Sequence, residues 1–152
     1  MKKLIELVNE LETYILQSDK VAPSISQSSI GWQIEHCLLT INLVTKALQQ
    51  SNPTLYKSKF SLAKLIFFTT KTIPRGKAKA PKIVQPQQFT QQSLLANIAT
   101  VNTSINILHS LPHNHFFAHP YFGNLQLHQA IKFLEIHTQH HLKIIKDINK
   151  KA

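Results

Sequence analysis

The chain has 152 residues, of which 43% are hydrophobic and 16% are charged. This length suits a single domain spanning residues 1–152, and the composition is too apolar for a disordered chain. There are only 3 glycines, and apolar residues rarely alternate with polar ones, so the sequence predicts an all-α domain.

Charge and cysteine content narrow the classes of protein further. The formal net charge of +10 is compatible with nucleic-acid binding, but the lysines are spread along the chain, which makes that role unfavoured. One cysteine, Cys37, excludes an internal disulfide and favours a reducing compartment, so we expect a cytoplasmic protein. We do not expect the first 16 residues to be a signal peptide, because three glutamates interrupt them, and no apolar run is long enough to span a membrane.

Apolar residues recurring every three or four positions predict the helices. The long ones are expected at residues 2–17, 30–50, 90–110 and 124–149, with Ser28 or Ser29 capping the second. A short helix at 61–70 and an extended proline-rich segment are expected between the second and third. Four long helices with one long crossover between the second and third are typical of a four-helix bundle.

The inward faces follow from the same spacing. In the second helix we expect this stripe to be Trp32, His36, Leu39, Leu43 and Ala47, and in the third Leu94, Ile98, Val101, Ile105 and Leu108. The last helix has a continuous seam of alternating three- and four-residue steps at positions 127, 130, 134, 137, 141, 144 and 148.

Two histidines, His137 and His141, occupy this seam where aliphatic residues are expected. Side chains four apart on a helix share one face, so both imidazoles can reach one metal ion. His36 offers a third imidazole on the second helix, and three imidazoles leave coordination positions open, as in catalytic metal sites. The alternative is that these are hydrogen-bonded core histidines without a ligand.

Two short motifs carry a family resemblance. Residues 32–36, Trp-Gln-Ile-Glu-His, together with residues 137–141, His-Thr-Gln-His-His, resemble the DinB-like (YfiT-like) superfamily of metalloproteins. The pattern HPYFGNL at residues 119–125, followed by IHTQHHLKII, is similar to one uncharacterised branch of it. One departure is that Leu142-Lys143 follows the histidine pair where family members often have Arg-Gly. This difference bears on which substrate the resemblance implies more than on the metal.

The resemblance implies a four-helix bundle that binds a divalent metal, nickel or zinc, and that forms dimers. Carried over by position, the metal ligands are His36, His137 and His141. The resemblance also implies that the metal activates either water, for hydrolysis, or a low-molecular-weight thiol, for transfer or isomerisation. The other hypotheses are a non-catalytic metal-binding or stress-response bundle and a basic nucleic-acid binder, so enzyme activity stays open.

Other histidines and charges have competing interpretations. His140 could replace His141 as ligand, or could be partly buried beside the site. His119 could lie near the mouth of the site, while His119-Pro120 is expected to begin a turn that precedes the last helix. A second metal site among His109, His113, His115 and His119 is unfavoured because their spacing matches no zinc signature. The basic residues between Arg75 and Lys82 could bind an anion, although a solvated connection is favoured.

The remaining polar candidates are expected to be structural. Glu35 is expected to point away from His36 into solvent, and Cys37 to be a small buried residue. With only 7 acidic residues, the chain lacks the ligands of a carboxylate-bridged di-iron site. No nucleophile elbow, phosphate-binding loop or dinucleotide-binding motif is present.

Overall fold

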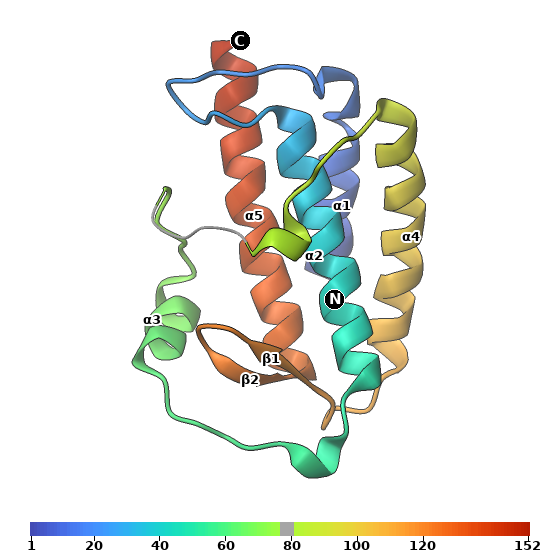
Figure 1. Ribbon diagram of the computed structural model, residues 1–152, viewed down its shortest axis with the longest axis vertical. Coiled ribbons are helices and arrows are strands. Elements are labelled where there is room, and N and C mark those ends of the chain that lie inside the picture. The colour runs from blue at the N-terminus through green and yellow to red at the C-terminus, as the bar shows by residue number, and fades with distance from the viewer. Residues whose placement is uncertain (77–80) are drawn as a thin grey trace.

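Four long helices pack side by side in the computed structural model, which describes residues 1–76 and 81–152 (Figure 1). They are α1 (Lys2–Glu12), α2 (Ile30–Gln50), α4 (Gln91–Ser110) and α5 (Leu127–Lys151). Both α1 and α2 contact α4 and α5. The predicted all-α bundle is therefore confirmed. Within the described residues, no helix has the length and apolarity needed to cross a membrane.

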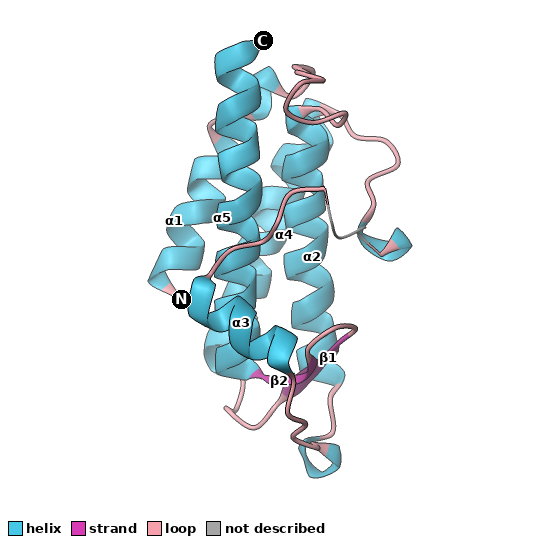
Figure 2. Cartoon of the chain, turned by 90° about the vertical axis from the view of Figure 1, so that its left-hand side faces the viewer, coloured by secondary structure: helices cyan, strands magenta, loops and turns pink. Residues whose placement is uncertain are grey.

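A long crossover joins α2 to α4, as predicted. These two helices run in the same direction, so the chain has to travel back along the bundle between them (Figure 1). The crossover carries η2 (Pro53–Leu55), α3 (Leu62–Thr70) and η3 (Lys82–Val84). Figure 2 shows α3 lying outside the bundle, beside the first turns of α5.

Side-chain caps explain where the helices begin. At α2, Ser29 is the cap, and its hydroxyl accepts a hydrogen bond from the backbone N–H of Trp32. Ser61 caps α3 in the same way, and Thr90 with Ser93 forms a reciprocal capping box at α4. Each cap satisfies backbone donors that the first turn of a helix leaves free.

The first helix is shorter than predicted. It ends at Glu12, and the short 3-10 turn η1 (Ile15–Gln17) replaces the expected last turn. The following loop bonds to the start of α2, because the backbone N–H of Gly31 donates to the carbonyl of Ser18 (2.8 Å). This tertiary hydrogen bond requires the chain to turn toward α2, which a continued helix would prevent.

A β-hairpin replaces the loop and first helical residues predicted before α5. Strands β1 (Phe116–His119) and β2 (Gly123–Gln126) pair antiparallel, with Phe116 opposite Gln126 and His119 opposite Gly123. The predicted turn does begin after His119, but the last helix starts at Leu127, not near 124. Gly123 has φ +69°, a left-handed conformation that suits glycine and closes the turn. The prediction failed because strand pairing depends on a partner segment as well as on local pattern.

The predicted inward faces of α4 and α5 are confirmed, but that of α2 is not. Every residue in the predicted α4 stripe is buried, and so is every α5 seam residue except the half-buried His141. On α2 only His36 of the five predicted residues is buried, and the core side chains are Ile30, Ile34, Cys37, Leu38, Ile41, Val44 and Leu48. This helix is covered by α4, α5, β1 and η3 together, so no single stripe defines its buried surface.

The end of the crossover packs tightly on the start of α2. The ring of Phe89 lies over Gly31, where the Cβ of any larger residue would overlap it. Glycine at this position therefore permits the close approach, and the crossover is held against the helix that carries His36.

Candidate metal centre

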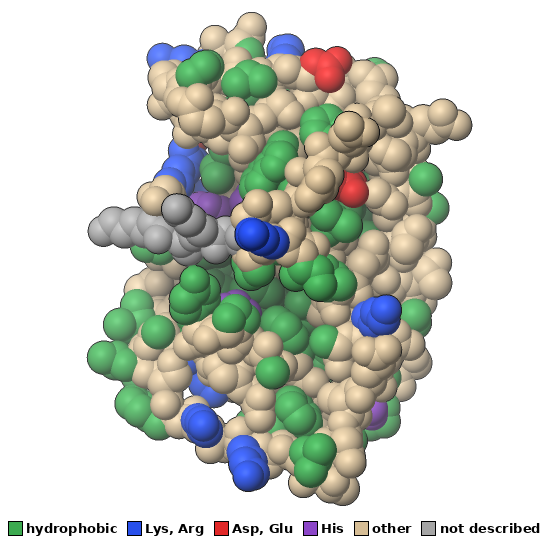
Figure 3. All heavy atoms as spheres, in the orientation of Figure 1, with side chains coloured by type: hydrophobic (Ala, Val, Ile, Leu, Met, Phe, Trp, Pro, Cys, Tyr) green, Lys and Arg blue, Asp and Glu red, His purple; other side chains and the backbone are tan. Residues whose placement is uncertain are grey.

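The structure brings His36 of α2 together with His137 and His141 of α5. One ring nitrogen from each residue lies within 4.8 Å of the other two. His36 and His137 are buried and His141 is half-buried. Figure 3 shows histidine side chains on the face that carries the crossover, with most of their surface covered by neighbours.

Two of the three rings are oriented by oxygen acceptors. His36 Nδ1 lies 2.7 Å from the backbone carbonyl of Val84, and His141 Nδ1 lies 2.6 Å from Gln33 Oε1. The Gln33 amide is oriented in turn, because its Nε2 donates to Ser26 Oγ (3.2 Å). A carbonyl oxygen can only accept, so both Nδ1 atoms carry the proton and both Nε2 atoms present a lone pair. Oxygen acceptors behind the ring are the usual arrangement of metal-binding histidines.

The spacing between rings also suits an ion. His36 Nε2 and His137 Nε2 are 3.1 Å apart. Metal–nitrogen bonds of about 2.0–2.1 Å place two nitrogens on one tetrahedral or octahedral ion roughly 2.9–3.4 Å apart. The donor set is three neutral imidazoles, which suits zinc or nickel, although other transition metals use the same ligands.

Packing alone does not explain why an imidazole, and not an aliphatic side chain, occupies position 137. Its Nδ1 is buried and has no hydrogen-bond partner within residues 1–76 and 81–152. An unsatisfied buried polar atom costs about 1–3 kcal/mol, whereas leucine would fill the same seam position without that cost. Keeping an imidazole here therefore favours a role for its other nitrogen.

Apolar rings contact two of the three histidines. The Trp32 indole stacks on His36 with ring centroids 5.1 Å apart and planes 15° apart. Phe133, one turn before His137, lies with its ring centroid 5.6 Å from that imidazole. These rings shield the imidazoles from water and limit how they can rotate.

Burial lowers the pKa of all three imidazoles. For His36 the hydrogen bond to the Val84 carbonyl partly opposes this effect. The pKa values of His137 and His141 fall well below the ordinary value, first through burial and then through the positive charge that neighbouring histidines would carry. The rings thus stay neutral to more acidic pH than free histidine. Three imidazoles of ordinary pKa would lose a bound metal ion below about pH 6, because protonation removes the lone pair that binds it. With their pKa values lowered, these three imidazoles are expected to lose a metal ion only at lower pH.

Gln33 and the Val84 carbonyl were not predicted from the sequence. Gln33 is almost fully buried on α2, and a glutamine among apolar residues three positions before a histidine is the one signal that could have indicated it. Val84 lies in the crossover, 48 residues from His36 along the chain, and no local pattern connects the two.

Replacing Gln33 with leucine is expected to weaken metal affinity by about 10- to 100-fold, because His141 would lose the acceptor that fixes its tautomer. Titration of metal-free protein with zinc or nickel measures the change. Gln49→Leu is the matched control, since Gln49 is an exposed residue of the same helix. Equal affinities for Q33L and Q49L would show that this contact does not support the site.

His140 lies beside the cluster without joining it. Its ring centroid is 5.0 Å from that of His141, and the two rings are nearly perpendicular. Burial, followed by the charges of Arg75 and Lys143, lowers its pKa to about 4.

His119 has a defined tautomer. Its Nδ1 accepts hydrogen bonds from the backbone N–H groups of Tyr121 (3.2 Å) and Phe122 (3.3 Å), so the proton lies on Nε2. The ring stacks on Phe122 and meets Phe133 edge-on, which joins the hairpin to α5. Burial lowers its pKa to about 4.

The depressed pKa of His119 predicts acid sensitivity. An unfolded histidine has a pKa of about 6.5, so the unfolded chain binds more protons between about pH 6.5 and 4, and the free energy of unfolding falls as pH falls through that window. His119→Gln should reduce the loss between pH 7 and pH 5 by on the order of 1 kcal/mol, a value discounted for the half-exposed ring. Urea denaturation of chelator-treated protein measures it. His113→Gln, at an exposed position, should leave the loss unchanged.

The other loop histidines do not gather into a second site. His115 Nδ1 lies 2.8 Å from the Leu48 carbonyl and 3.1 Å from Ser51 Oγ, tying the start of the hairpin to the end of α2. His109 and His113 are exposed. In the part of the chain that the structure describes, only the first cluster has three metal-binding side chains in reach of one another.

Glu35 corrects one prediction and Cys37 agrees with another. Glu35 is not solvated but buried, and both carboxylate oxygens accept hydrogen bonds from Asn97 Nδ2 (2.9 and 3.0 Å). Burial raises its pKa, partly offset by the Asn97 hydrogen bond. The error arose because α4 covers the side of α2 that carries Glu35. Cys37 is fully buried and free, as expected.

The basic segment of the crossover is described only in part. Arg75 forms an ion pair with Asp147 of α5 (2.7 Å), and Lys82 is exposed. Lys77 and Lys79 lie outside the described residues.

Comparison with known proteins identifies one family. The model of the family described as "Protein of unknown function (DUF1569)" matches residues 2–148. No curated protein and no solved structure matches the chain significantly. Because the family match runs from the first helix almost to the end of the last and includes all three clustered histidines, the chain belongs to the DUF1569 family.

Proposed function

We propose that this chain is a divalent-metal protein of the DinB-like superfamily, with His36, His137 and His141 as the ligands. The observation that carries the proposal is the arrangement behind the rings. Val84 and Gln33 hold two Nδ1–H groups from outside, so two Nε2 lone pairs are directed inward beside His137. Nickel or zinc is the proposed ion, because neutral imidazoles suit both.

The proposed activity is hydrolysis, or the transfer or isomerisation of a low-molecular-weight thiol. An ion held by three imidazoles would supply one property, a lowered pKa for water or a thiol in an open coordination position. The residues of the chain would then hold the ion, fix the ring orientations and keep the surroundings apolar. Trp32 and Phe133 serve the last purpose through their contacts with His36 and His137.

A non-catalytic metal-binding bundle is the second candidate, and the buried carboxylates favour it. Glu35 is engaged by Asn97, and Glu135 pairs with Lys132 (3.0 Å). Within the described residues, both carboxylates are therefore held by side chains other than the three histidines. In this candidate the ion would stabilise the fold or serve a stress response without turnover.

Metal content is the first test. Protein purified without a metal-affinity column is expected to contain about one equivalent of nickel or zinc, and chelation should lower its melting temperature. Panels of thiols and esters then separate the two candidates, because turnover that disappears with the metal supports the enzyme. A chelator-sensitive melt without turnover supports the binding protein, and metal-free protein that gains nothing from added metal refutes both.

The remaining proposals concern assembly and location. We propose a homodimer in the cytoplasm, comprising a single domain over residues 1–152. The family resemblance supports the dimer, and the buried free Cys37 is compatible with a reducing compartment. Light scattering of the purified chain tests the dimer.

A further inference from the structure

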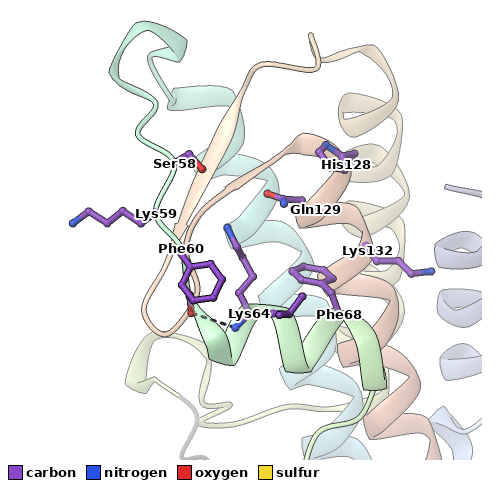
Figure 4. A pocket seen from close by; sticks show the side chains of 10 residues that line it. Ser58, Lys59, Phe60, Lys64, Phe68, His128, Gln129 and Lys132 are labelled. Carbon is purple, nitrogen blue, oxygen red and sulfur yellow. Dashed lines mark hydrogen bonds between the residues drawn. The ribbon is translucent and has the colours of Figure 1, made fainter.

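A pocket separate from the histidine cluster lies between the crossover and the start of α5. Its volume is about 580 Å³, within the range of small-molecule sites. Ser58, Phe60, Lys64 and Phe68 line it from the crossover, and Gln129 lines it from α5 (Figure 4). It therefore depends on α3 lying against α5.

Lys64 gives the pocket its charge. Its side chain extends between the rings of Phe60 and Phe68 toward Ser58 and Gln129 in Figure 4, whereas Lys59 and Lys132 extend outward. Lys64 is half-buried, and within the described residues no carboxylate pairs with it. Lys132 differs, because Glu135 neutralises it. With no acidic residue in the lining, an anion would provide the missing partner for the Lys64 ammonium group.

The walls of the pocket are mainly apolar. Phe60 is 86% exposed and Leu65 is 55% exposed, unusual values for large apolar side chains on a small domain. A ligand with an apolar body would cover both residues and remove their surface from water. The opposite face of α3 is buried through Phe67, whose ring contacts Phe122 and Phe133. Packing thus fixes α3 in place and leaves the pocket side free.

We propose that this pocket binds an amphipathic carboxylate, with the anionic head at Lys64 and the apolar chain against Phe60, Leu65 and Phe68. The inward-pointing Lys64 favours a small ligand over a membrane surface, which would contact outward-pointing lysines. The proposal concerns different residues from the metal site and does not depend on it.

Calorimetric titration with decanoate tests the proposal. Decanoate should bind at one site per chain, and acetate and decyltrimethylammonium should bind at least about tenfold more weakly, since each lacks one of the two features recognised. Lys64→Met, which keeps the apolar stem of the side chain, should weaken decanoate binding by about tenfold or more. Phe60→Ser, at an exposed position, should weaken it without affecting folding.

Lys46→Met is the control, because Lys46 is an exposed lysine on α2 away from the pocket. Its affinity for decanoate should equal that of the unmodified protein. The proposal is overturned if K46M and K64M lose equal affinity, if decyltrimethylammonium binds as well as decanoate, or if decanoate does not bind. It is also overturned if the chain binds anionic phospholipid vesicles but not the monomeric carboxylate.

Discussion

Replacing His137 with alanine is expected to reduce metal content from about one equivalent to nearly zero. The Nε2 atom of His137 lies 3.1 Å from that of His36, and His137 precedes His141 by one turn of α5. Loss of His137 therefore leaves only two ligands, one on α2 and one on α5. Affinity should fall by more than the roughly 100-fold that loss of an outer hydrogen-bond partner can cause. Elemental analysis gives the stoichiometry, and titration of chelated protein with zinc or nickel gives the affinity.

His140, the neighbour of His141 in the sequence, supplies the control for this experiment. His140→Ala removes an imidazole of the same helix whose ring lies against His141 but which is outside the cluster. It should keep full metal content. If H137A retains its metal while H140A loses it, the ligand set proposed here is wrong and His140 takes the place of His137.

Replacing His137 with leucine is expected to stabilise the metal-free protein and to abolish its response to metal. Leucine matches the aliphatic seam of α5 and removes the buried Nδ1 that lacks a partner among the described residues. The free energy of unfolding of the chelated protein should rise by at most about 1–3 kcal/mol, the cost of such an atom, because His36 Nε2 loses its 3.1 Å contact with His137 Nε2 at the same time. Urea denaturation with and without added zinc measures both effects.

Thr138→Val separates the effect of metal from that of polarity. Thr138 is fully buried next to His137, and its hydroxyl also lacks a partner among the described residues. The valine variant should gain stability in the same direction but keep its response to zinc. A His137→Leu protein that is less stable than the unmodified chain without metal would indicate that the imidazole is a structural residue.

Together these variants distinguish why a polar ring occupies a core position. A structural histidine satisfies both of its nitrogens and loses stability when replaced, whereas a ligand keeps an unfavourable ring for the sake of what it binds. His36 and His141 each have an oxygen acceptor behind the ring. His137 has none among the described residues, so it gives the clearest answer.

The sequence alone was sufficient to predict the four long helices, apart from the end of α1 and the start of α5, and the α5 seam. Three- and four-residue spacing is a local property, because a helix exposes the same face at every turn, and the predicted stripes of α4 and α5 are buried as expected. The same spacing placed His137 and His141 on that seam and His36 on the buried side of α2. The sequence therefore predicted these three residues as candidates for one site.

Tertiary structure decided everything that depends on which segments meet. The hairpin before α5 depends on two neighbouring segments pairing with each other. The wide burial of α2 and the pairing of Glu35 with Asn97 follow from contacts between distant parts of the chain. So do the two acceptors behind the rings, because Val84 reaches His36 from the crossover and Gln33 reaches His141 from α2. Local pattern records which face of an element is apolar, but it does not record what covers that face, and the orientation of the imidazoles depends on the covering residues.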